Sequence, residues 1–219
     1  MAIRTTAILN LKGGVAKTTT AINMAAILAT KYGKRVLLID ADSQCNTTEF
    51  FGGENAGDTL ACVLRGSRYC EDAEFIARHA IQSTGIENLD LIPADDTLMD
   101  MDLSAASSGD VDVNVLRSLV EEVREVYDYV LIDCPPAFNA AAAAALVAAD
   151  DVIIPIKLDA EQQLRAAGFR VFRHIRRSDK VDRMTFQQEA LLISSPNSGA
   201  GIDYRAFVAE YVGGADNGL

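Results

Sequence analysis

Length, composition and charge exclude several classes of protein. The chain has 219 residues, of which 49% are hydrophobic and 23% charged, so the sequence predicts a folded protein with a substantial core rather than a disordered one. The formal net charge of −11 excludes broad coating of nucleic acid, so any contact with DNA requires a local basic patch. We expect a single domain over residues 1–219.

Cysteine usage and hydropathy point to a cytoplasmic protein without a membrane partner. No charge-free apolar run is long enough to cross a bilayer, the first residues lack a signal-peptide pattern, and residues 213–219 do not read as a membrane anchor. The spacing of the cysteines suits neither a zinc site nor a disulfide scaffold, which favours reduced thiols. The cysteines are Cys45, Cys62, Cys70 and Cys134.

The strongest motif lies in residues 10–20, Asn-Leu-Lys-Gly-Gly-Val-Ala-Lys-Thr-Thr-Thr. The apolar run 7–9 precedes it and the helical pattern 21–28 follows it. A strand, a glycine loop, a lysine, a hydroxyl and a helix in this order are typical of a P-loop. Gly13 and Gly14 would let backbone N–H groups curl around phosphate oxygens without a Cβ in the way.

Within this loop, Lys17 would reach the β- and γ-phosphates of a nucleotide and Thr18 would ligate Mg²⁺, next to the positive end of the helix dipole. The usual P-loop pattern is not met, because Leu11 and Ala16 stand where it asks for glycine. We expect Ala16 to be tolerated because its place at the helix start predicts helical backbone angles.

A second lysine, Lys12, precedes the glycines and gives Lys-Gly-Gly-x-x-Lys-Thr-Thr. This pattern resembles the deviant Walker A motif of the ParA/MinD group of ATPases, and the resemblance implies that Lys12 reaches across a dimer interface to the other subunit's nucleotide. The alternative is a glycine turn beside a surface lysine. The residues assigned to the nucleotide are Lys12, Gly13, Gly14, Val15, Ala16, Lys17, Thr18 and Thr19.

The apolar run 36–39 predicts a strand buried on both faces, and it ends at Asp40 and Asp42. Members of the family often have Asp-x-Asp-Pro-Gln-Gly-Asn here, whereas residues 40–46 read Asp-Ala-Asp-Ser-Gln-Cys-Asn. The resemblance implies that Asp42 acts on the attacking water and that Asp40 holds a water of the Mg²⁺ shell. The alternative makes Asp42 a helix N-cap. The residues implied in catalysis are Lys12, Lys17 and Asp42.

Residues 127–132 predict another buried strand, which ends in Asp133 like a Walker B motif. The continuation Asp-Cys-Pro-Pro resembles the same family and implies that Asp133 polarises a water on Mg²⁺. No histidine lies near Cys134 in sequence, so a packed thiol is favoured over a nucleophile. The residues implied at the metal are Thr18, Asp40 and Asp133.

The remaining patterns alternate between strand and helix. Together they predict an α/β fold, with a mostly parallel, doubly wound sheet and helices on both faces, as in P-loop NTPases. Four aspartates at 95, 96, 100 and 102 lack calcium-loop spacing and favour a solvated face over a metal site. The further strands expected are 88–94, 151–156 and 190–193. The further helices expected are 59–64, 113–126, 139–149, 160–177 and 202–212, with a polar connection at 178–189.

The expected helix 160–177 has one apolar face and one basic face. Its basic residues would fall within an arc of about 120° at about 100° per residue. They could bind DNA in the ATP-bound dimer, or they could form only the solvated face of an amphipathic helix. These residues are Arg170, Arg173, Arg176, Arg177 and Lys180.

The resemblance as a whole implies a ParA-type partition ATPase. Such a protein binds ATP and Mg²⁺, forms a homodimer on ATP binding, binds DNA non-specifically and hydrolyses ATP slowly. A ParB-like activator protein and a cytoplasmic, nucleoid-associated location in plasmid or chromosome segregation are implied as well. Relatives usually continue with a further strand, a loop that helps to hold adenine, and a helix, roughly 30–40 residues in all. Adenine recognition is therefore left open.

Alternatives come from other classes. A hydrolysis-deficient nucleotide- and DNA-binding scaffold would retain only an interaction surface. A MinD-like positioning ATPase would need a membrane-anchoring helix, for which the sequence gives no pattern. A carrier of metal clusters would need a pair of closely spaced cysteines, and the sequence has none.

Overall fold

The computed structural model describes residues 3–52, 58–65, 78–101, 111–157 and 161–216. Cys70 and Asp102 lie outside these ranges. Six strands form one sheet in the order β3-β4-β2-β5-β1-β6, and every pair is parallel except β3 with β4. The strands are β1 Arg4–Ile8, β2 Val36–Asp40, β3 Gln82–Ser83, β4 Leu89–Ile92, β5 Tyr129–Asp133 and β6 Asp151–Ile153.

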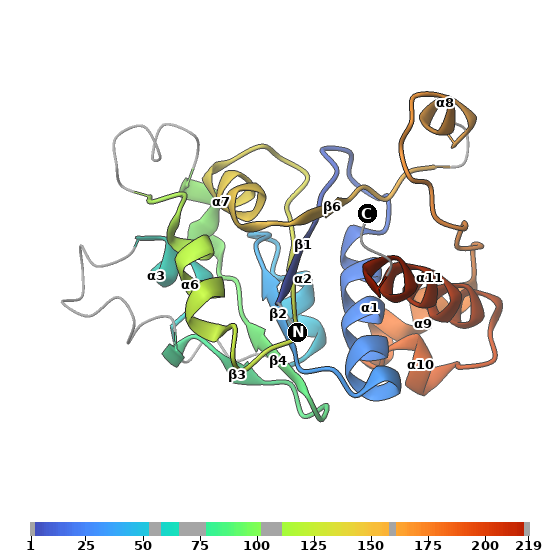
Figure 1. Ribbon diagram of the computed structural model, residues 1–219. Coiled ribbons are helices and arrows are strands. Elements are labelled where there is room, and N and C mark those ends of the chain that lie inside the picture. Colours follow the sequence, from blue (N-terminus) through green and yellow to red (C-terminus); the bar gives the residue numbers. More distant parts are fainter. Residues whose placement is uncertain (1–2, 53–57, 66–77, 102–110, 158–160, 217–219) are drawn as a thin grey trace.

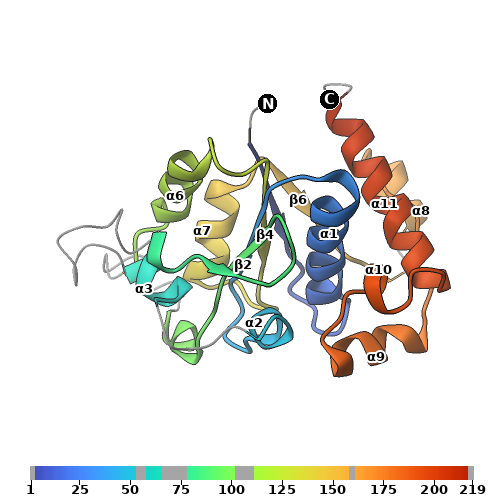
Figure 2. The ribbon, with the colours of Figure 1, turned by 90° about the horizontal axis from the view of Figure 1, so that it is seen from below.

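Helices cover both faces of this sheet, as Figures 1 and 2 show. Helices α3, α6 and α7 pack on one face, and α1, α10 and α11 pack on the other. Among the described residues, none of the helices combines the length and apolarity needed to cross a bilayer. The helices are α1 Lys17–Tyr32, α2 Asn46–Phe50, α3 Leu60–Arg65, η2 Asp96–Asp100, α6 Val115–Val123, α7 Ala140–Ala148, α8 Glu161–Ala166, α9 Asp179–Gln187, α10 Leu191–Ser194 and α11 Gly199–Asp216.

The central strands form because their residues are apolar on both sides. Every residue of β2 and β5 is buried, which fits strands that lie between two helical layers. Two apolar clusters result, one on each face of the sheet. The predicted α/β architecture, with its mostly parallel sheet, is therefore confirmed.

The expected helix 160–177 is wrong. Helix α8 ends at Ala166, and Gly168 adopts a left-handed backbone with φ of 84°. The N–H of Phe169 donates to the Leu164 carbonyl, which closes the end of α8. Residues 169–178 have no regular secondary structure. The apolar side chains that were expected on one face of a helix, such as that of Phe172, instead pack against the core from this irregular segment.

Two neighbouring predictions are also wrong. The expected polar connection 178–189 contains α9, whose first turn is capped by the Ser178 hydroxyl accepting from the Lys180 N–H. The expected strand 190–193 is the short helix α10. The N–H of Leu191 donates to the Asn23 side chain on α1, so a side chain rather than a sheet neighbour satisfies it.

Candidate functional site

The glycine-rich loop lies at the carboxyl end of β1, which is flanked by β5 and β6. Gly13 and Gly14 are exposed, and a Cβ added to either residue would meet no atom within 4 Å. Gly14 has a φ of +67°, which favours glycine at this position. The loop therefore leaves open space in front of its backbone, as a phosphate-binding loop requires.

Hydrogen bonds hold the loop in place. The side chain of Asn10 accepts from the Lys12 N–H at 2.9 Å and donates to the Pro155 carbonyl at 2.7 Å. Asn10 thus ties the start of the loop to the segment that follows β6. Lys12 is exposed, whereas Lys17, the first residue of α1, is only 7% exposed.

The expected helical backbone at Ala16 is wrong. Ala16 has φ of 68° and ψ of 33°, in the left-handed region, and it is the N-cap that precedes α1. Its carbonyl accepts from the Thr20 N–H and so closes the first helical turn from outside the helix. A left-handed alanine costs about 1–2 kcal/mol, which is why glycine is usual where the chain enters a helix in this way.

Two aspartates face each other across neighbouring strands. Asp40 on β2 and Asp133 on β5 are in register, and both are buried. One oxygen of Asp40 accepts from the N–H and the hydroxyl of Thr48, each at 2.8 Å, and the other accepts from the Asp42 N–H at 3.1 Å. Burial raises the pKa of Asp40 to about 6 despite these hydrogen bonds.

Asp133 lacks the partners that a buried carboxylate needs. One of its oxygens accepts from the Thr47 hydroxyl at 2.8 Å, and the other is buried without a hydrogen bond. Burial, followed by repulsion from Asp40, raises the pKa of Asp133 to about 7, although the hydroxyls of Thr18 and Thr47 oppose the shift. A cation between these carboxylates and Thr18 would offset both the burial of the Asp133 charge and its repulsion from Asp40.

Asp42 is 7% exposed and accepts from the Gln44 N–H at 3.0 Å. The alternative reading as a helix N-cap is wrong, because α2 begins at Asn46 and Cys45 occupies its N-cap. Asp42 therefore lies in a turn beside the other two carboxylates, with a second oxygen for which no bond within the protein is described.

The donor set fits Mg²⁺ held largely through water. The described residues include no group of three or more His, Cys, Asp or Glu side chains that could hold a metal directly. Mg²⁺ usually keeps several waters and takes one or two protein oxygens besides phosphate. The Thr18 hydroxyl together with Asp40 and Asp133 supplies such oxygens. Of the other aspartates, Asp96 and Asp100 are exposed, and Asp95 is the N-cap of η2 and accepts from the Thr97 N–H at 2.8 Å.

The thiol of Cys134, directly after this site, is fully buried. Burial, with repulsion from Asp133, raises its pKa well above the usual range, so the reactive thiolate is disfavoured. The interpretation as a packed thiol is confirmed.

The five basic residues do not share one helical face. Two of them are committed to α11. Arg176 donates to both oxygens of Asp203, at 2.7 and 2.9 Å, and Arg170 donates to the Glu210 carbonyl at 2.8 Å. The sequence pattern missed Asp203, which is 2% exposed, because it lies 27 residues away.

Arg173 and Arg177 have exposed side chains with no hydrogen bond or ion pair among the described residues. Lys180 lies on α9, 3.9 Å from the Asp179 carboxylate. The basic residues available for a ligand are therefore Arg173, Arg177 and, partly, Lys180.

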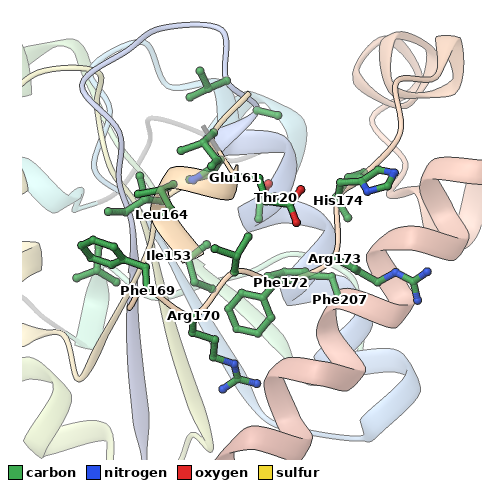
Figure 3. Close-up of a pocket in the computed structure, with 18 of the residues that line it drawn as sticks. Thr20, Ile153, Glu161, Leu164, Phe169, Arg170, Phe172, Arg173, His174 and Phe207 are labelled. Atoms are coloured by element: carbon green, nitrogen blue, oxygen red, sulfur yellow. The ribbon is translucent and has the colours of Figure 1, made fainter. Parts of the chain in front are cut away.

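A pocket of about 370 Å³ adjoins the loop (Figure 3). The last loop residues, Val15 and Ala16, form one wall, and the end of β6, residues 152–156, forms another. The irregular segment 169–175 and α11 complete it. Sequence reasoning missed this pocket, since it assigned the segment 169–175 to a helix.

Similarity to known proteins agrees with this geometry. A family model described as an AAA domain, AAA_31, matches residues 3–178. The chain is 42% identical over 153 residues to the sporulation initiation inhibitor protein Soj of Bacillus subtilis, and 40% identical over 161 residues to the chromosome partitioning protein ParA of Caulobacter vibrioides. The chain belongs to the ParA/MinD superfamily.

The superfamily match does not extend over the whole of these relatives. The aligned regions cover 70% and 72% of this chain but only 58% and 57% of Soj and ParA. Among solved structures, apo McdA from Cyanothece has a TM-score of 0.77 at 25% identity, over 96% of this chain and 99% of McdA. The septum site-determining protein MinD from Pyrococcus horikoshii, complexed with Mg-ADP, has a TM-score of 0.69 at 21% identity, over 97% of each chain.

Proposed function

We propose that this chain is a ParA-type partition ATPase that binds and hydrolyses ATP with Mg²⁺. The observation that carries the proposal is the buried carboxylate pair Asp40 and Asp133 at the edge of the sheet, with the Thr18 hydroxyl beside Asp133 in the first turn of α1. The similarity to Soj and ParA supports it, and the whole chain 1–219 would act as one ATPase domain.

The loop would bind the phosphates. Gly13 and Gly14 are exposed and their backbone N–H groups would bind phosphate oxygens, while the Lys17 ammonium would neutralise the β- and γ-phosphates. Lys12, exposed at the tip, would serve the nucleotide of a second subunit in an ATP-bound homodimer. The residues proposed to contact nucleotide are Lys12, Gly13, Gly14, Val15, Ala16, Lys17, Thr18 and Thr19.

Mg²⁺, when bound, neutralises charge on the phosphate oxygens. The residues of this chain would bind the Mg²⁺ ion. The Thr18 hydroxyl would be a direct ligand, and Asp40 and Asp133 would each accept hydrogen bonds from its waters. The oxygen of Asp133 that has no hydrogen bond is available for such a water.

Asp42 would align the water that attacks the γ-phosphate. It accepts only one described hydrogen bond, from the Gln44 N–H, so its second oxygen can accept from a water. The attack forms the bond from water oxygen to γ-phosphorus and breaks the bond to the β,γ-bridging oxygen, with ADP and phosphate as products. Positioning and charge neutralisation supply the catalysis.

Non-specific DNA binding would rest on Arg173, Arg177 and Lys180, since Arg170 and Arg176 are engaged with α11. In a dimer, two such clusters would be present. The family resemblance extends the proposal to a ParB-like activator protein and to a nucleoid-associated location in the cytoplasm.

A nucleotide titration by calorimetry tests the core of the proposal. We expect the wild type to bind Mg-ATP, and Lys17→Ala to weaken binding about 10- to 100-fold, because a charged contact to phosphate is lost. Lys31→Ala, in the exposed last turn of α1, is the matched control and should bind like the wild type.

Equal affinities for the wild type and Lys17→Ala would refute the phosphate-binding role of the loop. A measurement of phosphate release then distinguishes an ATPase from the hydrolysis-deficient scaffold. The wild type should release phosphate slowly, and Asp42→Ala should bind ATP without releasing it. A wild type that binds ATP and never releases phosphate would instead support the hydrolysis-deficient scaffold.

A further inference from the structure

Strand β6 forms an edge of the sheet, since it pairs with β1 alone among the described strands. Along residues 151–156, half-buried and exposed residues alternate, and the exposed ones are all apolar. Val152, Ile154 and Ile156 are 44%, 54% and 38% exposed. The pocket in Figure 3 borders residues 152–156, so there is space beside this edge. An edge strand with free backbone groups and apolar side chains is a surface on which another chain can pair.

The backbone groups of the three exposed residues face the open edge. The carbonyls of Ile153 and Pro155 accept from the Leu9 N–H and the Asn10 side chain, which places residues 153 and 155 toward β1. Neighbouring residues of a strand direct their backbone groups to opposite sides, so those of the exposed residues point outward. Pro155 has no N–H, but its position faces β1, so the outer row of donors is not interrupted.

The side chains of the three exposed residues lie on one face of the sheet. Val152 is in register with Ala7, whose side chain belongs to the core cluster under α6 and α7. Side chains alternate between the two faces along a strand, so Ile154 and Ile156 follow Val152 to the same face. Three β-branched side chains in a row thus present apolar surface whose removal from water is favourable.

This edge is complementary to a second copy of itself. In an antiparallel pair whose two-fold axis passes through Ile154, Val152 of each copy lies opposite Ile156 of the other, and Ile154 lies opposite Ile154. All of these are hydrogen-bonded pairs, because the backbone groups of these residues face the other copy. Each apolar side chain then meets another apolar side chain across the two-fold axis.

The two ends of the strand are complementary in charge. In the same register, Asp151 of each copy lies opposite Lys157 of the other, at a non-hydrogen-bonded pair where side chains approach closely. Lys157 is exposed, with no hydrogen bond or ion pair among the described residues. Asp151 pairs with Arg4, and its side chain is still 34% exposed. A register shifted in either direction would separate Asp151 from Lys157, so the charges favour this one.

We propose that the open edge of β6 is a docking surface for a second copy of this chain, which pairs with it antiparallel about Ile154 and joins the two sheets. The contact needs neither the P-loop nor a nucleotide. It is therefore distinct from the ATP-bound homodimer of the proposed function, in which Lys12 reaches the other subunit.

Sedimentation velocity of the full chain, in chelator and without nucleotide, tests this contact. We expect a reversible dimer of twice the 23.5 kDa chain mass. Ile154→Lys should weaken dimerisation on the order of tenfold, because it sets two ammonium groups opposite each other and removes an apolar pair. Ile193→Lys is the matched control and should dimerise like the wild type. Ile193 is 51% exposed on α10 and does not border the space beside β6.

Lys157→Glu tests the register. This variant sets a glutamate opposite Asp151 twice in the dimer, so the dissociation constant should rise about three- to tenfold. Lys31→Glu makes the same change in net charge in the exposed last turn of α1. It should leave the dissociation constant unchanged.

Four results would overturn the inference. A wild type that stays monomeric at every concentration has no such contact. A dimer that Ile154→Lys leaves intact uses another surface, and equal effects of Ile154→Lys and Ile193→Lys would show that β6 is not specific. Equal effects of Lys157→Glu and Lys31→Glu would refute the antiparallel register. Because no nucleotide is present, none of these results depends on whether the chain is an ATPase.

Discussion

At the scale of single residues, Asp133 carries an electrostatic cost in the metal-free protein. Its pKa of about 7 exceeds the ordinary aspartate value near 4, chiefly because the carboxyl is buried. The folded state therefore holds a proton that the unfolded state has released between about pH 4 and pH 7. Stability should fall as the pH rises through this window and then stay level.

Replacement of Asp133 by asparagine should remove much of this cost. In chelator at pH 8, Asp133→Asn should raise the free energy of unfolding by about 2–4 kcal/mol, since one raised pKa unit corresponds to about 1.4 kcal/mol. Urea denaturation at pH 5 and pH 8 would measure it. Added Mg²⁺ and ATP should stabilise the wild type and not the variant. A wild type that gains stability from pH 5 to pH 8 in chelator would contradict the argument.

At the scale of elements, an ion pair contributes to the attachment of the irregular segment 169–178 to α11. Arg176 is half-exposed, but Asp203 on α11 is 3% exposed at its side chain and receives two guanidinium hydrogen bonds. The aliphatic part of Arg176 lies against Gly199, where an added Cβ would collide with Arg176 Cδ. The segment is therefore attached to the first turn and a half of α11.

Removal of Arg176 should leave the Asp203 carboxylate without its main partner. We expect Arg176→Ala to lower the urea concentration at the midpoint of unfolding, because the buried Asp203 carboxylate loses two hydrogen bonds. Arg177→Ala is the matched control and should stay within about 0.5 kcal/mol of the wild type, because Arg177 is an exposed surface residue. Urea denaturation measures both, and equal effects would show that the ion pair contributes nothing.

At the scale of the whole molecule, DNA binding must overcome a net charge of −11. Three basic residues per subunit remain available, so an ATP-bound dimer would make about six phosphate contacts. The logarithm of the binding constant should then fall with the logarithm of salt concentration with a slope of about −5. Arg173 and Arg177 lie in the irregular segment 169–178, so they do not share the face of a helix.

Charge reversal of both residues tests this binding. Arg173→Glu with Arg177→Glu should abolish binding to unrelated duplexes alike, because phosphate contacts carry no sequence information. ATP hydrolysis without DNA should be retained by Arg177→Glu alone, since Arg177 neither belongs to the proposed catalytic set nor lines the pocket beside the loop, as Arg173 does. A gel-shift assay at low salt would measure it. A double variant that still shifts DNA, or a wild type that never does, would refute the DNA-binding segment.

The sequence by itself determined the elements that local pattern controls. Continuous apolar runs predicted β2 and β5, because a strand covered on both faces has no polar alternation to obscure it. Glycine and lysine spacing predicted the P-loop, and the glycine that ends α1, Gly33, has the left-handed backbone usual for a helix C-cap. The sequence placed Asp40 and Asp133 at the ends of buried strands, and parallel strands bring such residues to one edge of the sheet.

Tertiary structure decided what local pattern could not. The apolar residues in 160–177 recur at helical spacing, yet the left-handed Gly168 follows the end of α8. Contacts with α11 hold the residues after it in an irregular conformation. Short apolar runs such as 190–193 suit a strand or a helix equally, and Asn23 on α1 selected the helix by taking the Leu191 N–H. The Arg176–Asp203 pair and the pocket beside the loop depend on residues distant in sequence. Only the packed fold brings their partners together.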